Sequence, residues 1–167
     1  MTRRDLFFKW LYYAVAALLL LLLQSLLLGH VQVWGVHPFL PPVIVAVAAM
    51  LEGPVEGTVF AVCFGLACDL TMPGVIPCFY MLAFLLCALP AAMLARRRMS
   101  PGFLCALLCT LQAMLLMDLL QILLMSFQGG VDVGAALSLT GRETLVTAPL
   151  SPLVYLLLRS VNRRVMK

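Results

Sequence analysis

Residues 10–29 read WLYYAVAALLLLLLQSLLLG, an almost unbroken apolar run that follows the basic residues Arg3, Arg4 and Lys9. A helix of about 20 residues is long enough to cross the hydrocarbon core of a bilayer, which is about 30 Å thick. A basic flank before an apolar run is also typical of a secretory signal peptide, but no small-x-small cleavage site follows. We therefore interpret residues 10–29 as an uncleaved first transmembrane span.

The composition of the whole chain also indicates a lipid environment. Of its 167 residues, 64% are apolar and only 11% are charged, and the mean hydropathy is +1.10. In soluble domains charged side chains make up about a quarter of the residues. In lipid each apolar run must be helical to satisfy its own backbone hydrogen bonds. The sequence therefore predicts an all-α integral membrane protein.

Five further apolar runs follow the first, and proline and glycine residues separate them. The predicted spans are 10–29, 41–52, 55–72, 76–95, 102–127 and 143–160, in a single transmembrane domain over 1–167. The second run is short, so residues 41–72 could instead form a re-entrant hairpin, which would leave four spans. The third run has about 18 residues, enough to cross alone. We therefore favour a six-helix transmembrane bundle, with 128–142 as its largest segment outside the membrane.

The basic residues indicate the orientation of these spans. Cytoplasmic loops of membrane proteins carry an excess of Lys and Arg. With six crossings both termini and the 96–98 loop lie in the cytoplasm, and Arg142 alone of the basic residues lies outside. This places the chain in the cell membrane as a multi-pass protein. The basic residues flank apolar runs and form no stripe interleaved with aromatic residues, so we exclude nucleic-acid binding.

Sequence motifs for catalysis or cofactor binding are absent from the chain. The six cysteines form no C-x-x-C pair, and no histidine completes a metal site, so we interpret them as small packing residues. There is no G-x-S-x-G, H-E-x-x-H or glycine-rich phosphate loop. The expectation is a protein without a cofactor, a metal ion or an enzymatic activity.

The third run carries a stripe of small residues that ends in a carboxylate. Gly57, Ala61, Gly65 and Asp69 are spaced four apart, so they share one face of a helix. Small-xxx-small faces let another membrane helix approach closely. A carboxylate at the C-terminal end of a helix is disfavoured by the helix dipole, so the presence of Asp69 at this position requires an explanation. We expect helix or partner packing at this face, with Asp69 in a buried contact to the 71–74 turn or exposed to water.

A second group of polar residues lies in the last two runs. Asp118 and Gln121 share a face of the fifth run, and Arg142 and Glu143 begin the sixth. Polar side chains inside a membrane usually face the protein interior or a cavity. We expect a structural or partner-contact network, in which Arg142 neutralises Asp118 or Asp69. A proton- or cation-coupled transport role is the less favoured interpretation.

Several motifs together resemble the MreD family of rod-shape-determining membrane proteins. The segment Gly65-Leu66-Ala67-Cys68-Asp69-Leu70 is similar to the end of the family's glycine-spaced helix, and an apolar helix bearing Tyr80 follows it. Leu23-Gln24 in the first run, and Arg142-Glu143 with Pro149 and Pro152-Leu153 near the end, are similar too. Leu40-Pro41-Pro42 departs from the family pattern, which has a polar residue after the proline.

The resemblance implies a non-catalytic scaffold subunit of the bacterial cell-elongation complex, located in the inner membrane. Its implied partners are MreC, a single-span protein, and indirectly the MreB filament and the RodA–transpeptidase peptidoglycan synthase; a homo-oligomer is a further possibility. The implied fold is similar to the substrate-binding subunit of energy-coupling-factor transporters. That vitamin-binding subunit is also the main functional alternative, and it would need an outward-facing pocket lined by aromatic and polar groups.

Overall fold

The computed structural model describes residues 3–28, 34–72, 76–98, 102–127 and 133–165, and within these ranges the regular elements are helices. The chain begins with α1 (Arg3–Leu23), which continues into the π-helical turn η1 (Gln24–Leu28). Then follow α2 (Pro41–Glu52), α3 (Pro54–Thr71), α4 (Phe79–Arg98) and α5 (Phe103–Phe127). The chain ends with α6 (Val133–Thr147), the 3-10 turn η2 (Ala148–Leu150) and α7 (Ser151–Val165).

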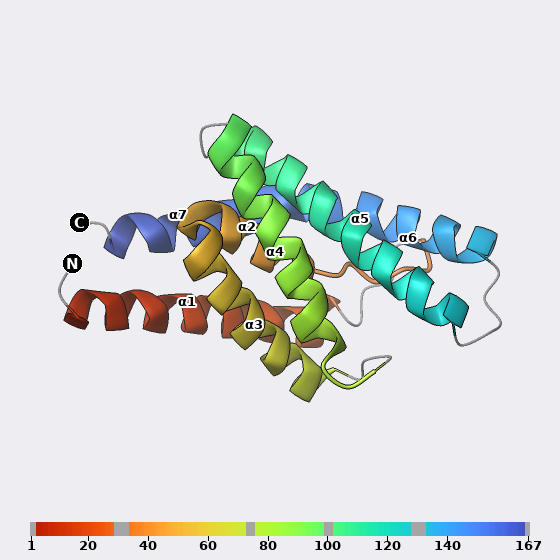
Figure 1. Ribbon diagram of the computed structural model, residues 1–167, viewed down its shortest axis with the longest axis horizontal. Helices are drawn as coiled ribbons and strands as arrows, with labels where there is room; N and C mark the ends of the chain where they lie inside the picture. Colours follow the sequence, from red (N-terminus) through yellow and green to blue (C-terminus); the bar gives the residue numbers. More distant parts are fainter. Residues whose placement is uncertain (1–2, 29–33, 73–75, 99–101, 128–132, 166–167) are drawn as a thin grey trace.

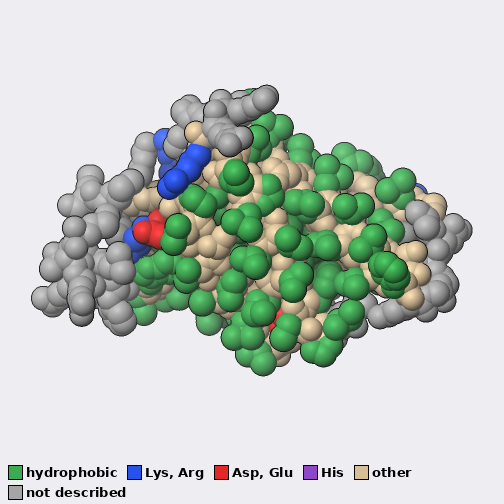
Figure 2. Space-filling model, in the orientation of Figure 1, with side chains coloured by type: hydrophobic (Ala, Val, Ile, Leu, Met, Phe, Trp, Pro, Cys, Tyr) green, Lys and Arg blue, Asp and Glu red, His purple; other side chains and the backbone are tan. Residues whose placement is uncertain are grey.

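Four helical segments are long and apolar enough to cross a membrane by length and composition: Lys9–Leu26, Pro54–Thr71, Phe79–Arg96 and Phe103–Phe127. Their outer faces carry exposed leucines, such as Leu18 on α1, Leu66 on α3 and Leu115 on α5. Hydrophobic side chains cover most of the face seen in Figure 2, and the charged side chains in view gather mainly near the end where both termini lie (Figures 1 and 2). This surface fits lipid, and the chain is an all-α, multi-pass membrane protein.

Helix α2 occupies the middle of the bundle. All ten residues from 41 to 50 are buried, and seven of them, Val43 to Ala49, are 0% exposed. Apart from Pro41, Pro42 and Met50, they are valine, isoleucine and alanine, which are small or β-branched residues that allow neighbouring helices to approach. Its 12 residues rise only about 18 Å, less than the hydrocarbon thickness. The helix is therefore a core element that is too short to cross the hydrocarbon region alone.

The small-residue stripe of α3 packs inside the chain. A Cβ atom added to Gly57 would lie 2.5 Å from the Cα atom of Ala49 in α2, and one added to Gly65 would lie 2.5 Å from the Cα atom of Met81 in α4. Ala61, between them, is 0% exposed. Glycine thus sets the distance from α3 to both neighbours. The stripe is therefore occupied by α2 and α4 of the same chain.

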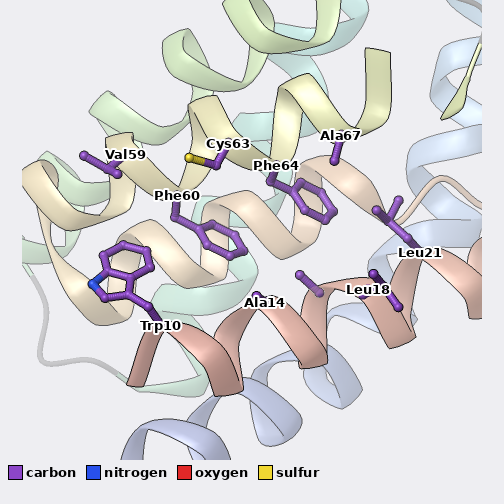
Figure 3. A pocket seen from close by; sticks show the side chains of 10 residues that line it. Trp10, Ala14, Leu18, Leu21, Val59, Phe60, Cys63, Phe64 and Ala67 are labelled. Atoms are coloured by element: carbon purple, nitrogen blue, oxygen red, sulfur yellow. The ribbon is translucent and has the colours of Figure 1, made fainter. Parts of the chain in front are cut away.

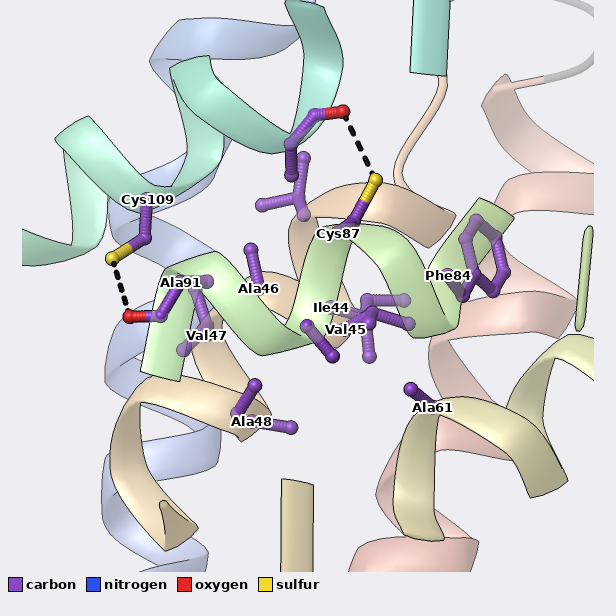
Figure 4. Close-up of a cluster of buried hydrophobic side chains, with 14 of the residues drawn as sticks. Ile44, Val45, Ala46, Val47, Ala48, Ala61, Phe84, Cys87, Ala91 and Cys109 are labelled. Carbon is purple, nitrogen blue, oxygen red and sulfur yellow. Dashed lines mark hydrogen bonds between the residues drawn. The ribbon is translucent and has the colours of Figure 1, made fainter. Parts of the chain in front are cut away.

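Helices α4 and α5 pack on the side of α2 shown in Figure 4. The thiol of Cys87 donates to the Ala113 carbonyl oxygen at 3.5 Å, and the thiol of Cys109 donates to the Ala91 carbonyl oxygen at 3.5 Å. Thiols are weak donors, so these contacts add to the packing of small residues at the interface. Both cysteines are buried and free.

The end of the chain differs from the predicted last span, 143–160. The helix α6 already begins at Val133, inside the segment 128–142 that was expected to lie outside the membrane, and η2 separates it from α7. The two helices follow one another along the long axis of the molecule (Figure 1). Pro149 and Pro152 explain the interruption, because each lacks a backbone N–H group and clashes with the preceding helical turn. The run 143–160 is therefore divided between α6, η2 and α7.

Candidate functional site

Asp69 joins the end of α3 to the beginning of α4. Its Oδ1 atom accepts a hydrogen bond from the Tyr80 N–H group at 3.1 Å, and its Oδ2 atom accepts one from the Met81 N–H group at 3.1 Å. The first N–H groups of a helix have no partner within the helix, so a carboxylate there satisfies them and is favoured by the helix dipole. The contact to the 71–74 turn stays a prediction, because residues 73–74 of that turn lie outside the described residues.

Gln24 and Thr147 hold the extended segment that leads into α2. The Gln24 Nε2 atom donates to the Pro38 carbonyl oxygen at 2.8 Å, and the Leu40 N–H group donates to Gln24 Oε1 at 3.1 Å. The Phe39 N–H group donates to Thr147 Oγ1 at 3.2 Å. Non-helical backbone at membrane depth is tolerated only where the protein satisfies it. Gln24, which lies in η1, therefore has a structural role. The role of Thr147 was not predicted, because a single threonine is a weak sequence signal.

Asp118 lies between α5 and α6. Its Oδ2 atom accepts a hydrogen bond from Thr144 Oγ1 at 3.4 Å, and its side chain lines a cavity of about 380 Å³ between these helices. Gln121, one turn further along α5, and Glu143 on α6 are half-buried. Asp69 and Asp118 thus have different surroundings, since the first caps α4 and the second faces α6.

Arg142 does not act as expected. Its side chain is exposed, and among the described side chains the ion pairs are those of Lys9 with Glu52 and Glu56. No ion pair within this set joins Arg142 to Asp118 or Asp69, so the predicted neutralisation is wrong. The early start of α6 explains the difference, because Arg142 falls in the middle of a helix and its side chain leaves on the face that carries exposed residues.

Lys9, Glu52 and Glu56 form a charged cluster where α1, α2 and α3 meet. The Lys9 Nζ atom pairs with Glu52, and it lies 2.6 Å from Glu56 Oε2. The Glu52 side chain is only 7% exposed, whereas that of Glu56 is 40% exposed. Glu56 lies in the first turn of α3, where a carboxylate is favoured by the helix dipole. The contact with Lys9, more than 40 positions away, was missed because nothing local indicates it.

A groove runs between α1 and α3 on the outer side of the bundle (Figure 3). The part of the groove nearer the start of α1 has a volume of about 500 Å³. There, Ala14, Leu18 and Leu21 of α1 face Phe60, Cys63 and Ala67 of α3. A second cavity of about 540 Å³ continues it toward Gln24, Ser25 and Thr71, and shares Leu18, Leu21 and Ala67 with the first. The lining is almost entirely apolar, so the groove suits lipid chains or another apolar helix.

Among the described residues no group of three or more His, Cys, Asp or Glu side chains is arranged to hold a metal ion. Comparison of the chain with known protein families, with curated proteins and with solved structures found no match.

Proposed function

We propose that this chain is a non-catalytic scaffold subunit of the bacterial cell-elongation complex, in the manner of MreD. The observation that carries the proposal is the use of the intramembrane polar groups. Asp69 caps α4, Gln24 and Thr147 hold the segment before α2, and Asp118 contacts Thr144. Polar groups inside a membrane usually mark an ion path or a substrate site. Here they bond to the chain's own backbone or hydroxyl groups, which supports a framework role.

The proposed arrangement has six crossings, with both termini in the cytoplasm of a bacterial inner membrane. Helix α2 with its extended lead-in forms the second crossing, and α6, η2 and α7 together form the last. Two observations support it: the two termini lie at the same end of the molecule (Figure 1), and α3 is long enough to cross alone. The second of these disfavours the re-entrant hairpin over residues 41–72, in which neither run crosses.

The proposed partners are MreC, through helix–helix contact in the membrane, and indirectly MreB and the RodA–transpeptidase synthase. Helix–helix contact is favoured because the described part of the chain is built almost entirely of helices, and their outer residues, such as Leu19 and Leu119, are exposed and apolar. Membrane helices associate by close packing and hydrogen bonding rather than by apolar burial. A partner would therefore bind where small residues or unpaired polar groups reach the surface.

The test is replacement of the resident MreD in a rod-shaped bacterium by this chain, followed by purification in mild detergent. The proposal expects rod shape to be retained and MreC to co-purify. Round cells, with no MreC in the purified material, would contradict it. A vitamin bound in stoichiometric amount would instead favour the substrate-binding subunit of an energy-coupling-factor transporter, the alternative function.

A further inference from the structure

The hydrogen bonding of Asp118 is weaker than that of Asp69. Asp69 accepts hydrogen bonds from two backbone N–H groups at 3.1 Å each. Among the described residues Asp118 accepts one, from the Thr144 hydroxyl group at 3.4 Å, and that hydroxyl group also lies 3.0 Å from the Thr140 carbonyl oxygen. A hydroxyl group has a single proton to donate, so the shorter contact with Thr140 competes for it. Asp118 is only 9% exposed, so the chain's own groups compensate poorly for its burial.

No described side chain forms an ion pair with Asp118, since the ion pairs among these side chains belong to the cluster around Lys9. Glu143 of α6 is half-buried and adds a second negative charge, which the charge of Asp118 repels. Asp118 also lies about 14 Å of helix rise before the end of α5 at Phe127, inside an apolar span. An acidic group at such a depth is costly unless it is paired. A positive group from outside the chain would therefore be stabilised beside Asp118.

The cavity of about 380 Å³ beside Asp118 has room for such a group. It lies between α5 and α6, which contact one another along the bundle (Figure 1). Small-molecule sites in proteins have volumes of about 300–1,000 Å³ and a mostly apolar lining with a few polar groups. This cavity has such a lining, because Asp118 and two threonines stand among three leucines and an isoleucine: Leu115, Leu119, Ile122, Leu137, Thr140 and Thr144. The three leucines are exposed at the bundle surface, so the cavity opens toward lipid.

We propose that the cavity between α5 and α6 binds an amphipathic ammonium compound that enters from the bilayer. Its cationic head donates hydrogen bonds to the Asp118 carboxylate, and its apolar tail contacts the leucine side chains that line the cavity. A metal ion is a poorer occupant, because hard cations need several oxygen ligands and one carboxylate lines this cavity. A neutral lipid chain would leave the charge of Asp118 uncompensated. This ligand site goes beyond the proposed scaffold role and does not rest on it.

The experiment measures binding of tritiated octylamine, which is a monocation at neutral pH, to the full chain in phosphatidylcholine nanodiscs. Binding to empty nanodiscs is subtracted, because the amine also partitions into lipid. Tritiated octanol, which has the same tail without the charge, is the matched control ligand. We expect saturable binding of octylamine at one site per chain, and binding of octanol that is weaker by about tenfold or more.

Two variants test the role of the cavity. Asp118→Asn keeps the size of the side chain and removes its charge, and we expect it to weaken octylamine binding by about tenfold or more. Gly141→Leu fills the cavity, where nothing lies within 4 Å of an added Cβ atom, and should abolish binding while the fold is retained. The controls Asp69→Asn and Cys63→Leu, which remove a carboxylate and enlarge an exposed residue elsewhere, should change the dissociation constant by less than about twofold. Monodisperse elution of every variant serves as the folding check.

A diazirine derivative of octylamine locates the site, because its photochemical adducts mark the residues that it contacts. We expect saturable adducts within 115–122 of α5 and 137–144 of α6. Octanol that binds as tightly as octylamine, or octylamine binding that is unchanged in Asp118→Asn, would overturn the proposal. Absence of saturable binding would overturn it as well, and would indicate that a proton neutralises Asp118 instead. Each of these results leaves the proposed scaffold function standing, because that function is tested by cell shape and by co-purification of MreC.

Discussion

Helices α1 and α2 are both apolar, but they have opposite surroundings. In α2 the ten residues from 41 to 50 are all buried, whereas only 28% of the 18-residue window Lys9–Leu26, which covers most of α1, is buried. Their compositions differ in the same sense: α2 consists largely of valine and alanine, and α1 is rich in leucine. In lipid, apolar character does not distinguish the inside of a protein from the outside. Side-chain size does, because close packing favours small residues and the shorter β-branched valine over leucine.

The sharpest test of this comparison is the contact between α2 and α3. Gly57→Leu forces a side chain into the space occupied by Ala49, whose Cα atom is 2.5 Å from the position of the new Cβ atom. We expect a loss of about 3 kcal/mol or more in the free energy of unfolding. Denaturant titration in detergent micelles measures it. Gly141→Leu is the control, because nothing lies within 4 Å of a Cβ atom there; equal losses in both variants would show that α2 is not the tightly packed core.

The next largest effect is expected from the segment that precedes α2. Gln24→Leu removes the acceptor for the Leu40 N–H group and the donor to the Pro38 carbonyl oxygen. Two buried backbone groups without partners should cost about 2–3 kcal/mol. Hydrogen exchange measures the opening of the amides at the start of α2, and Ser25→Leu at the next, exposed position serves as the control. Unchanged protection in Gln24→Leu would contradict the bracing role.

A smaller effect is expected where α1 joins α2 through charge. Lys9→Met leaves the nearly buried Glu52 side chain without its cation, and we expect a loss of about 1–2 kcal/mol, moderated by the exposure of Glu56. The second change Glu52→Gln should restore part of the loss, because it removes the unpaired charge. The double variant therefore separates an electrostatic effect from a packing effect. If it is no more stable than Lys9→Met, the ion pair does not join α1 to the core.

The smallest effect is expected at the α3–α4 junction. The Asp69 carboxylate accepts one hydrogen bond from each of the Tyr80 and Met81 N–H groups, both at 3.1 Å. Asp69→Asn leaves a single acceptor oxygen for these two N–H groups. The loss should be about 1 kcal/mol, typical of a weakened helix cap. We expect faster hydrogen exchange at these two amides and unchanged hydrogen exchange in α2. Asp69→Leu should have a larger effect than Asp69→Asn, and equal effects would argue against capping.

The sequence predicts the apolar runs well because length and hydropathy are local properties. The run 41–52 coincides with α2, and the interruptions at Gly53 and near Pro101 separate helices as proline and glycine do elsewhere. The start of α6 was not foreseen, because Gly134, Ser138 and Thr140 give that segment the composition of a loop. In the structure these residues belong to a helix that packs against α5.

The candidate site was predictable only in part. Asp69 stood out as a carboxylate at the end of an apolar run, and Gln24 as part of a motif in the first run, yet their partners are backbone groups brought together by the fold. The pair of Lys9 with Glu52 spans two helices, and a basic residue before a first span is already explained by topology. The groove depends on how far α1 stands from α3, and no residue pattern encodes that separation.

The most direct test of the account is photochemical footprinting with a diazirine reagent that partitions into the lipid phase. The account predicts strong labelling of the exposed α1 positions, such as Leu18, Leu19 and Leu22, and almost none over the ten buried residues 41–50 of α2. Labelling of α2 to the same extent as α1 would contradict the claim that α2 is the closed core of the bundle and α1 is part of its lipid-facing surface.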